Sequence, residues 1–560
     1  MLSISIQLNS LMNLSLIWLT VKCQRVQYKQ NYSKYAMQNI DLSQEVILLI
    51  AQSLSLSIGG KIEEALDCLD KVRLLRPDFF PILLDKGKLL MQLSRFEEAA
   101  ASFDELLKYR PTLAEVKHLR IEALNLALTD LQGIVQTKLN QDSAFYFKQG
   151  SILLQLGRIE EAISNLNQCL VLDKMHESAL NLLGNTLTEA GELHMALAIY
   201  EQLLLISPRN PVAIFNRANV LQKLHQYQDA IKEYQLAIEI HPDFAEAWIE
   251  QSHCRLALGD FETGWQQFEW RWKTAQLKPF RLNSPAPLWL GQFPLHDKTI
   301  LLWAEQGFGD TIQFSRFVSM VSKTAKQVIL RLPTPLTSLM HTLDGNIQII
   351  DEENVVPEHD TQSPLLSLAL VFKINQTNIP ADVPYISADD TDIKKWQKKL
   401  KSFKKFKVGI VWAGRQYGLI NHTRDIALSD FHGLTELNID LIGLQKEIPQ
   451  ADKQSLSSFP KSITIGERLE DFNDTAGLIT NLDLVISVDS AVAHLAGAMG
   501  KPTWLLLRNQ GEWRWLENHS ESPWYPKHRI FRQKTANHWA DLIQEVVQQL
   551  RKKLDTNRLN

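Results

Sequence analysis

Two polar residues follow an apolar run at a point where they can meet a ligand. The run, Leu484 to Val488, is short and nearly unbroken, as in a strand buried on both faces of a parallel sheet. Asp489 and Ser490 come next, followed by a helix-forming segment that contains His494. A helix N-terminus leaves backbone N–H groups unpaired, so this turn can hold a diphosphate with two hydroxyl-type ligands beside it. The alternative is a helix-capping aspartate and a core histidine.

A second turn of this kind lies earlier in the chain. Thr299 to Ala304 has the pattern of a buried strand, and the sequence EQGFGD follows it with Gly307 and Gly309. These glycines allow a tight backbone turn and leave Asp310 at the start of an amphipathic helix, Thr311 to Ser322. Because ligands of open α/β sheets lie outside the carboxyl ends of the strands, both turns are predicted to face a ligand.

Two α/β units are needed to position these turns. The first unit contains the Thr299 strand, and the second begins after a lysine-rich stretch that reads as a solvated helix face. The further segments that we expect in the two sheets and at the chain end are 327–332, 346–350, 363–370, 408–412, 441–444, 462–465, 484–488, 503–507 and a final helix at 539–550. Alternation of strands and helices predicts doubly wound α/β units in series.

A helical repeat precedes these units, from about Asp41 to Trp272. Ala162, Ala196 and Ala230 are each 34 residues apart, and other columns keep the same period. Small residues recur where two helices of a unit meet: Gly150, Gly184 and Ala218 in the first helix, and the three alanines in the second. The pattern resembles tetratricopeptide repeats, with about six units and a degenerate one around 112 to 142. Such units stack into a superhelix with a concave surface.

The end of the array and the prolines after it mark a domain boundary. The sequence GWQQFEWRW, Gly264 to Trp272, is dense in large aromatics and predicts a packed interface with the next domain. Several prolines then indicate an extended connector. The predicted divisions are a disordered or mis-started tail at 1–40, the repeat array at 41–276, a connector at 277–298, a first α/β domain at 299–390, a linker at 391–407 and a second α/β domain at 408–553.

The composition excludes some classes of partner and site. Lys and Arg number 59 against 63 Asp and Glu, which argues against a nucleic-acid partner. Four widely spaced cysteines, Cys23, Cys68, Cys169 and Cys254, indicate neither a disulfide framework nor a zinc site, and a cytoplasmic location fits best. The first 21 residues make a poor signal peptide, so we expect no membrane association, with weak association through this segment as the alternative.

Several motifs, in order, carry a more specific resemblance. They are PLWLG, AEQGFGDTIQF, PLLSL, VGIVWAG, LQK, FNDTAGLI, DLVISVDSAVAHLAGAMGKPTWLLL, WRWL and SPWYP. The part from about Ser284 to Phe531 resembles the family 9, heptosyltransferase-like glycosyltransferases, and the whole chain resembles bacterial proteins that join tetratricopeptide repeats to that domain. O-linked N-acetylglucosamine transferases, which share this plan, are a second resemblance. The implied fold is an all-α tetratricopeptide superhelix followed by two Rossmann-like domains of the GT-B type, the second of which binds the donor.

The resemblance also implies an activity. It is the transfer of a sugar from a nucleotide-sugar donor to an acceptor hydroxyl, without a metal ion and with the nucleotide sugar as substrate rather than cofactor. The repeat array would bind a protein or other acceptor or partner, or would serve only as a rigid spacer. A catalytically inactive repeat-protein scaffold is the other alternative. An epimerase is disfavoured, since no early Gly-x-Gly-x-x-Gly turn is present.

Residue roles follow from the same resemblance. Asp310 matches the general base, and Asp489, Ser490 and His494 match the donor-binding motif. Arg424 or Lys446 would supply the cation for the leaving group. The turn glycines are Gly307, Gly309 and Gly414.

The chain departs from the family pattern after VWAG. Relatives carry Asn-Pro and a later Asp-Arg, whereas this chain has Arg415-Gln416 and then Asn421-His422-Thr423 before Arg424. A surface arginine is therefore the alternative for Arg424. The segment Trp513 to Trp515 is expected to line the core and the cleft, with nucleobase stacking as a further option.

Overall fold

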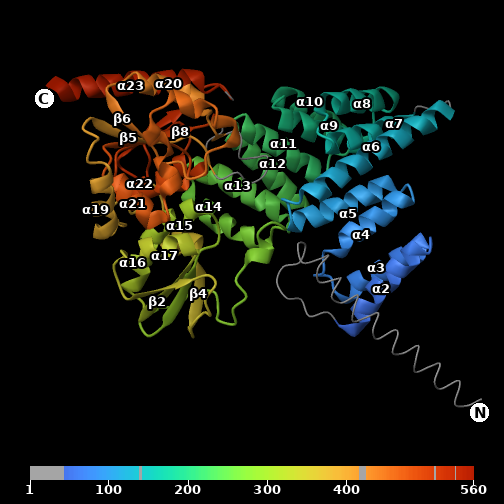
Figure 1. The fold of residues 1–560 in the computed structure, drawn as a ribbon, viewed down its shortest axis with the longest axis horizontal. Helices are drawn as coiled ribbons and strands as arrows, with labels where there is room; N and C mark the ends of the chain where they lie inside the picture. The colour runs from blue at the N-terminus through green and yellow to red at the C-terminus, as the bar shows by residue number, and fades with distance from the viewer. Residues whose placement is uncertain (1–42, 138–141, 415–423, 510–511, 537, 560) are drawn as a thin grey trace, which may run out of the picture. The chain divides into compact units, whose positions relative to one another are not determined.

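A computed structural model of the protein describes residues 43–559, apart from 138–141, 415–423, 510–511 and 537 (Figure 1). The chain forms two compact units, residues 1–208 and 209–560. This division lies inside the repeat array, so the last repeats belong to the same compact unit as the α/β region. The predicted tail at 1–40 lies outside the described residues, and the other predicted domain limits stay predictions.

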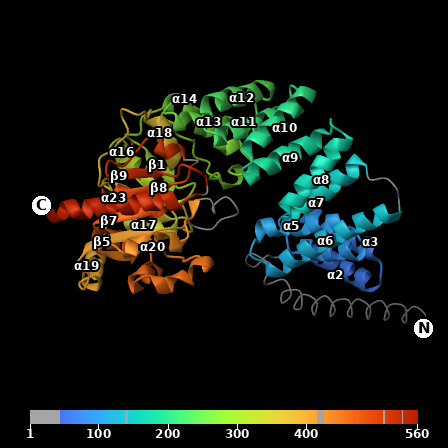
Figure 2. The same ribbon diagram turned by 90° about the horizontal axis from the view of Figure 1, so that it is seen from above.

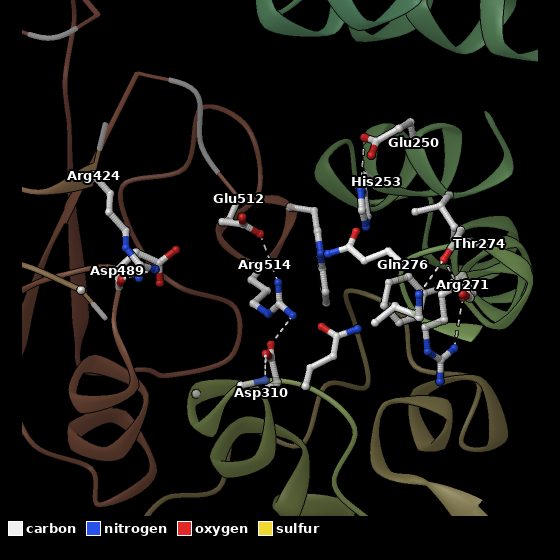
Figure 3. Close-up of a pocket in the computed structure, with 18 of the residues that line it drawn as sticks. Glu250, His253, Arg271, Thr274, Gln276, Asp310, Arg424, Asp489, Glu512 and Arg514 are labelled. Atoms are coloured by element: carbon white, nitrogen blue, oxygen red, sulfur yellow. Dashed lines mark hydrogen bonds and ion pairs between the residues drawn. The ribbon is translucent and has the colours of Figure 1, made fainter. Parts of the chain in front are cut away.

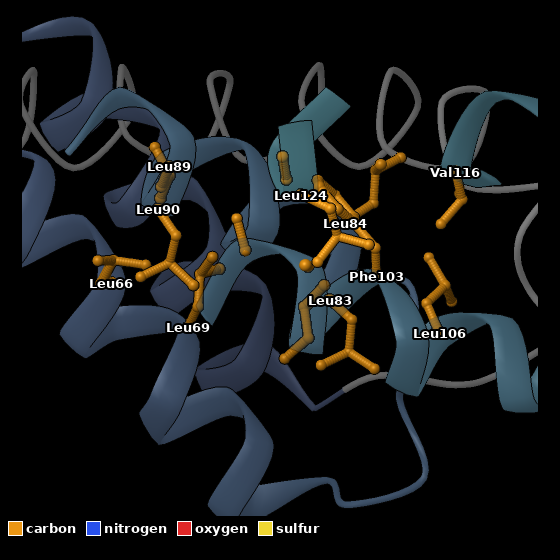
Figure 4. Close-up of a cluster of buried hydrophobic side chains, with 14 of the residues drawn as sticks. Leu66, Leu69, Leu83, Leu84, Leu89, Leu90, Phe103, Leu106, Val116 and Leu124 are labelled. Carbon is orange, nitrogen blue, oxygen red and sulfur yellow. The ribbon is translucent and has the colours of Figure 1, made fainter. Parts of the chain in front are cut away.

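The described part of the first unit consists of helices, which pack in consecutive pairs except for α6. Their bounds are α2 Gln44–Ile58, α3 Ile62–Leu75, α4 Ile82–Gln92, α5 Phe96–Tyr109, α6 Ala114–Thr137, α7 Ser143–Gln155, α8 Ile159–Leu172, α9 Glu177–Ala190 and α10 Leu193–Ile206. Figure 4 shows leucines such as Leu66, Leu90 and Leu106 gathered with Phe103 between the first helices, where they are buried. Burial of such apolar side chains is the main stabilising contribution to each interface.

Small residues at the predicted columns let paired helices approach closely. A Cβ added to Gly184 of α9 would lie 2.7 Å from the Tyr200 ring of α10. The Tyr200 hydroxyl donates a hydrogen bond to Asn185 at 2.6 Å, so the buried phenol is also satisfied. The 34-residue period is therefore a packing requirement of each helix pair.

The degenerate unit forms one long helix within the described residues. Helix α6 has 24 residues and packs between α5 and α7. This single helix stands where a helix pair would otherwise stand, which explains why Ala99 and Ala162 are out of register with the period.

The second unit begins with two more helix pairs. They are α11 Pro211–Lys223, α12 Tyr227–Ile240, α13 Ala245–Ala257 and α14 Phe261–Phe268, followed by the 3-10 helix η1 Glu269–Lys273. With the four pairs of the first unit, the described residues contain six pairs, in agreement with the six units that the period predicts.

The aromatic segment at the end of the array forms the predicted interface. Trp265 of α14 is buried, and its indole N–H donates to the carbonyl of Ile374 at 3.1 Å. Its ring makes edge contacts with Phe314 and with Trp513, which lie in the two different α/β regions. The last repeat is therefore fixed against both regions.

Two parallel sheets form the rest of the second unit. The four-stranded sheet has the order β3-β2-β1-β4, with β1 Thr299–Trp303, β2 Gln327–Leu332, β3 Ile347–Asp351 and β4 Thr361–Pro364. The five-stranded sheet has the order β6-β5-β7-β8-β9, with β5 Phe406–Val411, β6 Ile439–Gly443, β7 Leu484–Val488, β8 Thr503–Leu507 and β9 His528–Arg532. All paired strands are parallel, as the buried apolar runs predict.

Short helices surround the sheets. They are α15 Phe308–Phe314, α16 Val318–Ser322, α17 Thr334–Met340, α18 Leu368–Val371, α19 Asp390–Lys399, α20 His432–Thr435, α21 Phe472–Thr480, α22 Ala491–Ala498 and α23 Ala540–Leu559. Helix α23 packs against β9 and α20, over the second sheet (Figures 1 and 2). No helix among the described residues is long and apolar enough to span a bilayer.

Two local features differ from the sequence patterns. The helix predicted at 311–322 breaks into α15, a 3-10 turn and α16, and the turn directs Arg316 inward, where it donates to the carbonyls of Pro380 and Trp524. The segment 462–465 lies in a 3-10 helix, Lys461–Arg468, rather than in a sheet. Helix α19 lies in the lysine-rich stretch at 391–407, as its interpretation as a solvated helix face predicts, and Trp396 is buried while the lysines lie around it.

A histidine near the start of α12 ties the repeats to the second α/β region. The ring nitrogens of His225 lie 3.0 Å from a Glu517 oxygen and 2.9 Å from the Asn509 side-chain oxygen. Because both neighbours are acceptors, only the protonated ring can donate to both. The hydrogen bond to Glu517 accordingly raises the pKa of His225 above its ordinary value of 6.5. The same bond lowers the pKa of Glu517 despite its burial.

This contact predicts a pH-dependent stability. A raised pKa in the folded state means that the contribution of His225 is present in full below about pH 6.5 and is lost as the pH rises through the raised value. We expect His225→Gln to lower the unfolding midpoint at pH 6, by the equivalent of about 1 kcal/mol, and to have less effect at pH 9. Scanning calorimetry of both proteins at several pH values measures this difference. An equal effect at both pH values would exclude a charged His225.

Candidate functional site

A cavity of about 750 Å³ lies in the second unit, between α13, η1 and the two α/β regions (Figure 3). Its polar lining comes from the end of the repeat array and from both α/β regions. The charged lining residues are Glu246, Glu250, His253, Arg271, Asp310, Arg424, Asp489, Glu512 and Arg514. The predicted glycines Gly307, Gly309 and Gly414, together with Ser490 and His494, complete the set of predicted residues that line it.

The sheet topology explains why the cavity lies here. In the first sheet the chain runs from β1 outward to β3 and then returns to β4 on the other side of β1. In the second sheet it runs from β5 to β6 and then returns to β7 on the other side of β5. Such topological switch points open a crevice at the carboxyl ends of the strands. Asp310 follows β1, and Asp489 follows β7, so each lies at a switch point.

Asp310 has one oxygen on its own helix and one in the cavity. Its Oδ2 accepts from the backbone N–H of Gly307 at 3.0 Å, which stabilises the start of α15. Its Oδ1 accepts from Arg514 of the second α/β region. About 20% of the side chain is exposed, so the carboxylate remains within reach of a ligand.

Arg514 is the central cation of the cavity in Figure 3. Besides Asp310 it contacts Glu512 at 3.1 Å and donates to the side-chain oxygen of Gln313 at 3.1 Å. Its guanidinium lies 4.1 Å from the centre of the Trp513 ring. Burial opposes the charge, but Asp310 and Glu512 outweigh it and raise the pKa, so the group stays protonated.

The turn after β7 has the predicted form. Ser490 is the N-cap of α22, and its hydroxyl accepts from the N–H of Ala493 at 3.3 Å. Asp489 therefore precedes the cap and does not make it. Burial, together with the nearby Glu512 carboxylate, raises the pKa of Asp489 to about 6. The helix N-terminus and both side chains open on the same cavity.

His494 combines core packing with a place in the lining. Its ring stacks on Trp515 at 5.1 Å, and its Nδ1 lies 2.9 Å from the Tyr525 hydroxyl. Its Nε2 lies 3.9 Å from Asp489. Burial, with Arg514 nearby, holds the pKa of His494 well below its ordinary value, so the imidazole is neutral.

Helices α15 and α22 meet through a glycine. A Cβ added to Gly309 would lie 2.8 Å from His494 Cδ2 and 3.5 Å from the Cα of Ala491. Any side chain at position 309 would therefore force the two helix starts apart. This contact sets the separation of Asp310 and Asp489 across the cavity.

The two predicted cations have different positions. Arg424 lines the cavity beside Gly414 and donates to the backbone carbonyl of Asp489 at 3.3 Å. Lys446 is exposed, donates to the carbonyl of Glu470 at 2.8 Å and is not part of the lining. The departure from the family pattern at 415–423 lies outside the described residues.

An ion network centred on Arg271 lies at the cavity wall. The guanidinium of Arg271 contacts Glu269 at 2.7 Å and Glu305 at 3.0 Å, and it donates to the Ser367 hydroxyl at 2.8 Å. The side chains of Arg271 and Glu305 are each 1% exposed. Burial raises the pKa of Glu305 to about 7, against the attraction of Arg271. This network joins η1 to the first α/β region. Glu305 and Asp310 both belong to the turn after β1, and of these two carboxylates Asp310 lines the cavity.

Sequence reasoning missed the repeat helix that forms one wall. Glu250 and His253 of α13 line the cavity and lie 3.3 Å apart. Burial disfavours the charged form of both side chains, but their attraction for each other opposes this effect. As a result, the pKa of His253 is raised and that of Glu250 is lowered. Arg514 was expected only as lining. Its position between two aromatics in WRWL, in the segment that follows the strand predicted at 503–507, was the signal available for it.

Family models match both halves of the chain. Tetratricopeptide-repeat models match residues 52–114, 143–174 and 187–254. A model described as glycosyltransferase family 9 (heptosyltransferase) matches residues 468–547. The latter match includes Asp489, His494 and Arg514, whereas Asp310 and Arg424 lie outside it.

The individual relatives and solved structures that are similar cover different shares of the chain. Protein FlbA of Caulobacter vibrioides is 23% identical over 526 residues, with 88% of this chain and 82% of the relative covered. The Hsp70-Hsp90 organizing protein of Triticum aestivum is 30% identical over 77 residues, covering 14% of this chain and 13% of the relative. The crystal structure of YrrB, described as a TPR protein with an unusual peptide-binding site, is 19% identical, covers 37% of this chain and 91% of that chain, and has a TM-score of 0.21.

The protein is thus a helical repeat protein whose C-terminal part carries two parallel sheets with a cavity at their strand ends. Tetratricopeptide-repeat models and, over residues 468–547, a glycosyltransferase family 9 model match the chain, as the motifs predicted.

Proposed function

We propose that the protein is a glycosyltransferase with two Rossmann-like domains in the GT-B arrangement. It moves a sugar from a nucleotide-sugar donor to an acceptor hydroxyl. One observation carries this proposal: the cavity brings Asp310, at the carboxyl end of β1, opposite the N-terminus of α22 at the carboxyl end of β7. A carboxylate on one side and an anion-binding helix start on the other are the two groups that such a transfer requires.

The donor would bind on the side of the second sheet. Its diphosphate would lie over the N-terminus of α22, where backbone N–H groups and the helix dipole favour negative charge. Ser490 and Asp489 lie at this turn and can contact donor hydroxyls. Arg424 would add a cation at the same edge.

The acceptor would bind on the side of Asp310. The carboxylate takes the proton of the acceptor hydroxyl while the hydroxyl oxygen forms a bond to the anomeric carbon. The bond from that carbon to the diphosphate oxygen breaks, and the nucleoside diphosphate leaves with the electron pair. Arginine and backbone N–H groups would stabilise its charge, so the proposal needs no metal ion and no separate cofactor.

The repeat array would present the acceptor, which we propose to be a protein or a glycan. Phe215 of α11 and Glu250 of α13 line the cavity, so the array takes part in its wall. An acceptor bound by the last repeats, in α11 and α13, would therefore lie at the cavity wall.

Replacement of Asp310 tests the proposed base. Asp310→Asn keeps the size and the capping ability of the side chain but removes the base. We expect turnover to fall by about 10²- to 10⁴-fold. Hydrolysis of nucleotide sugars, in which water takes the place of the acceptor, measures this rate without a known acceptor.

The matched control is Asp297→Asn, which removes a carboxylate that is 86% exposed and pairs with His296. This variant should keep the full rate. Full activity of Asp310→Asn would mean that the residue only caps α15, and it would remove the proposed base.

Removal of the first compact unit tests the role of the array. The fragment 209–560 keeps the helices that line the cavity, so we expect it to hydrolyse the donor at nearly the rate of the full chain. Transfer to macromolecular acceptors in an extract of the source cells should fall strongly, as followed with a radiolabelled donor. Equal labelling by fragment and full chain would identify residues 1–208 as a spacer.

A further inference from the structure

The proposed base is occupied by a cation in this structure. Arg514 donates to Oδ1 of Asp310, the oxygen that is not used by Gly307. A carboxylate in such an ion pair must give up the pair before it can take a proton from an acceptor. Asp310 therefore becomes free to act only when another anion binds Arg514 in its place.

Arg514 lies where the diphosphate of a bound donor can replace Asp310 as its partner. Its neighbours include Asp310 on one side of the cavity and Asp489, at the start of α22, on the other. The Arg514 side chain is 10% exposed and lines the cavity, so solvent screens it little. Within this lining Arg514 is surrounded by carboxylates, and Glu512 holds one of its nitrogens at 3.1 Å.

Charge decides which partner Arg514 prefers. A carboxylate offers one negative charge, whereas a diphosphate offers about two and presents oxygens that match the guanidinium fork. Glu512 would keep one side of the guanidinium fixed while the other side turns from Asp310 to the phosphate.

We propose that Arg514 binds the donor diphosphate and that this binding releases Asp310 to act as the base. The inference rests on the proposed function, since it assigns a donor-binding residue to that same cavity. It also sets an order: the acceptor hydroxyl is activated only after the donor is in place. Asp310 and the donor thus compete for one guanidinium.

Isothermal titration calorimetry of two variants of the full chain tests whether Asp310 and a diphosphate compete for Arg514. The probes are inorganic pyrophosphate, ADP, GDP and UDP. Arg514→Gln removes the shared cation and should weaken binding by about 10- to 100-fold. Asp310→Asn removes the competitor and should tighten binding by about two- to fivefold, the factor that corresponds to release of a partly exposed ion pair. In the double variant the tightening should vanish, because no guanidinium is left to release.

The controls separate this account from a structural role. Arg529→Gln removes an exposed arginine of β9 that contacts Gln549 and should leave binding unchanged. A merely structural Arg514 would lower the unfolding midpoint without changing affinity, and Asp310→Asn would then not tighten binding. If Arg514→Gln does not fold, Arg514→Lys takes its place: it keeps the charge but loses the guanidinium fork and should still weaken binding. Asp310→Asn remains the second test.

The outcomes distinguish the two proposals. If the unaltered protein binds none of the probes, the donor site itself is wrong. If it binds a probe and neither Arg514 variant weakens that binding, or if Asp310→Asn does not tighten it, the donor site stands and the role of Arg514 is overturned.

Discussion

The ion pair between Asp310 and Arg514 connects the two α/β regions at the point where their strand ends meet. It depends on the close approach of α15 and α22, which the absence of a side chain at Gly309 permits. Around it, Asp489, Glu512 and Arg424 place alternating charges in a partly buried space. Because such charges are poorly screened, the pairing of each one depends on which others are present. The proposed chemistry therefore follows from an electrostatic balance that a charged ligand would change.

The end of the repeat array holds this arrangement in place. Trp265 packs against rings of both α/β regions, and Arg271 is buried between Glu269 and Glu305. Removal of one partner from such a buried network leaves an uncompensated charge, which is costly. The last repeats are consequently part of the cavity's framework, and the helix pairs at 209–268 belong to one compact unit with it.

Sequence patterns predicted the elements whose residues are neighbours along the chain. The strand Leu484–Val488, the turn and α22 follow from an apolar run and a helix-forming run, and the repeat follows from its period. Arg514 could not be predicted as a cavity cation, because its partner Asp310 lies 204 positions away. The break in the helix at 311–322 has the same origin, since Arg316 bonds to Trp524, 208 positions further on. Long-range pairing of polar groups leaves no local period to detect.

In the proposed function, the cavity holds the diphosphate of a nucleotide-sugar donor at the start of α22. A crystal structure of the full chain with a bound nucleoside diphosphate tests it most directly. We expect phosphate oxygens within hydrogen-bond distance of the backbone N–H groups that follow Ser490, with the guanidinium of Arg514 on the phosphate and no longer on Asp310. A nucleotide bound outside this cavity would contradict the account.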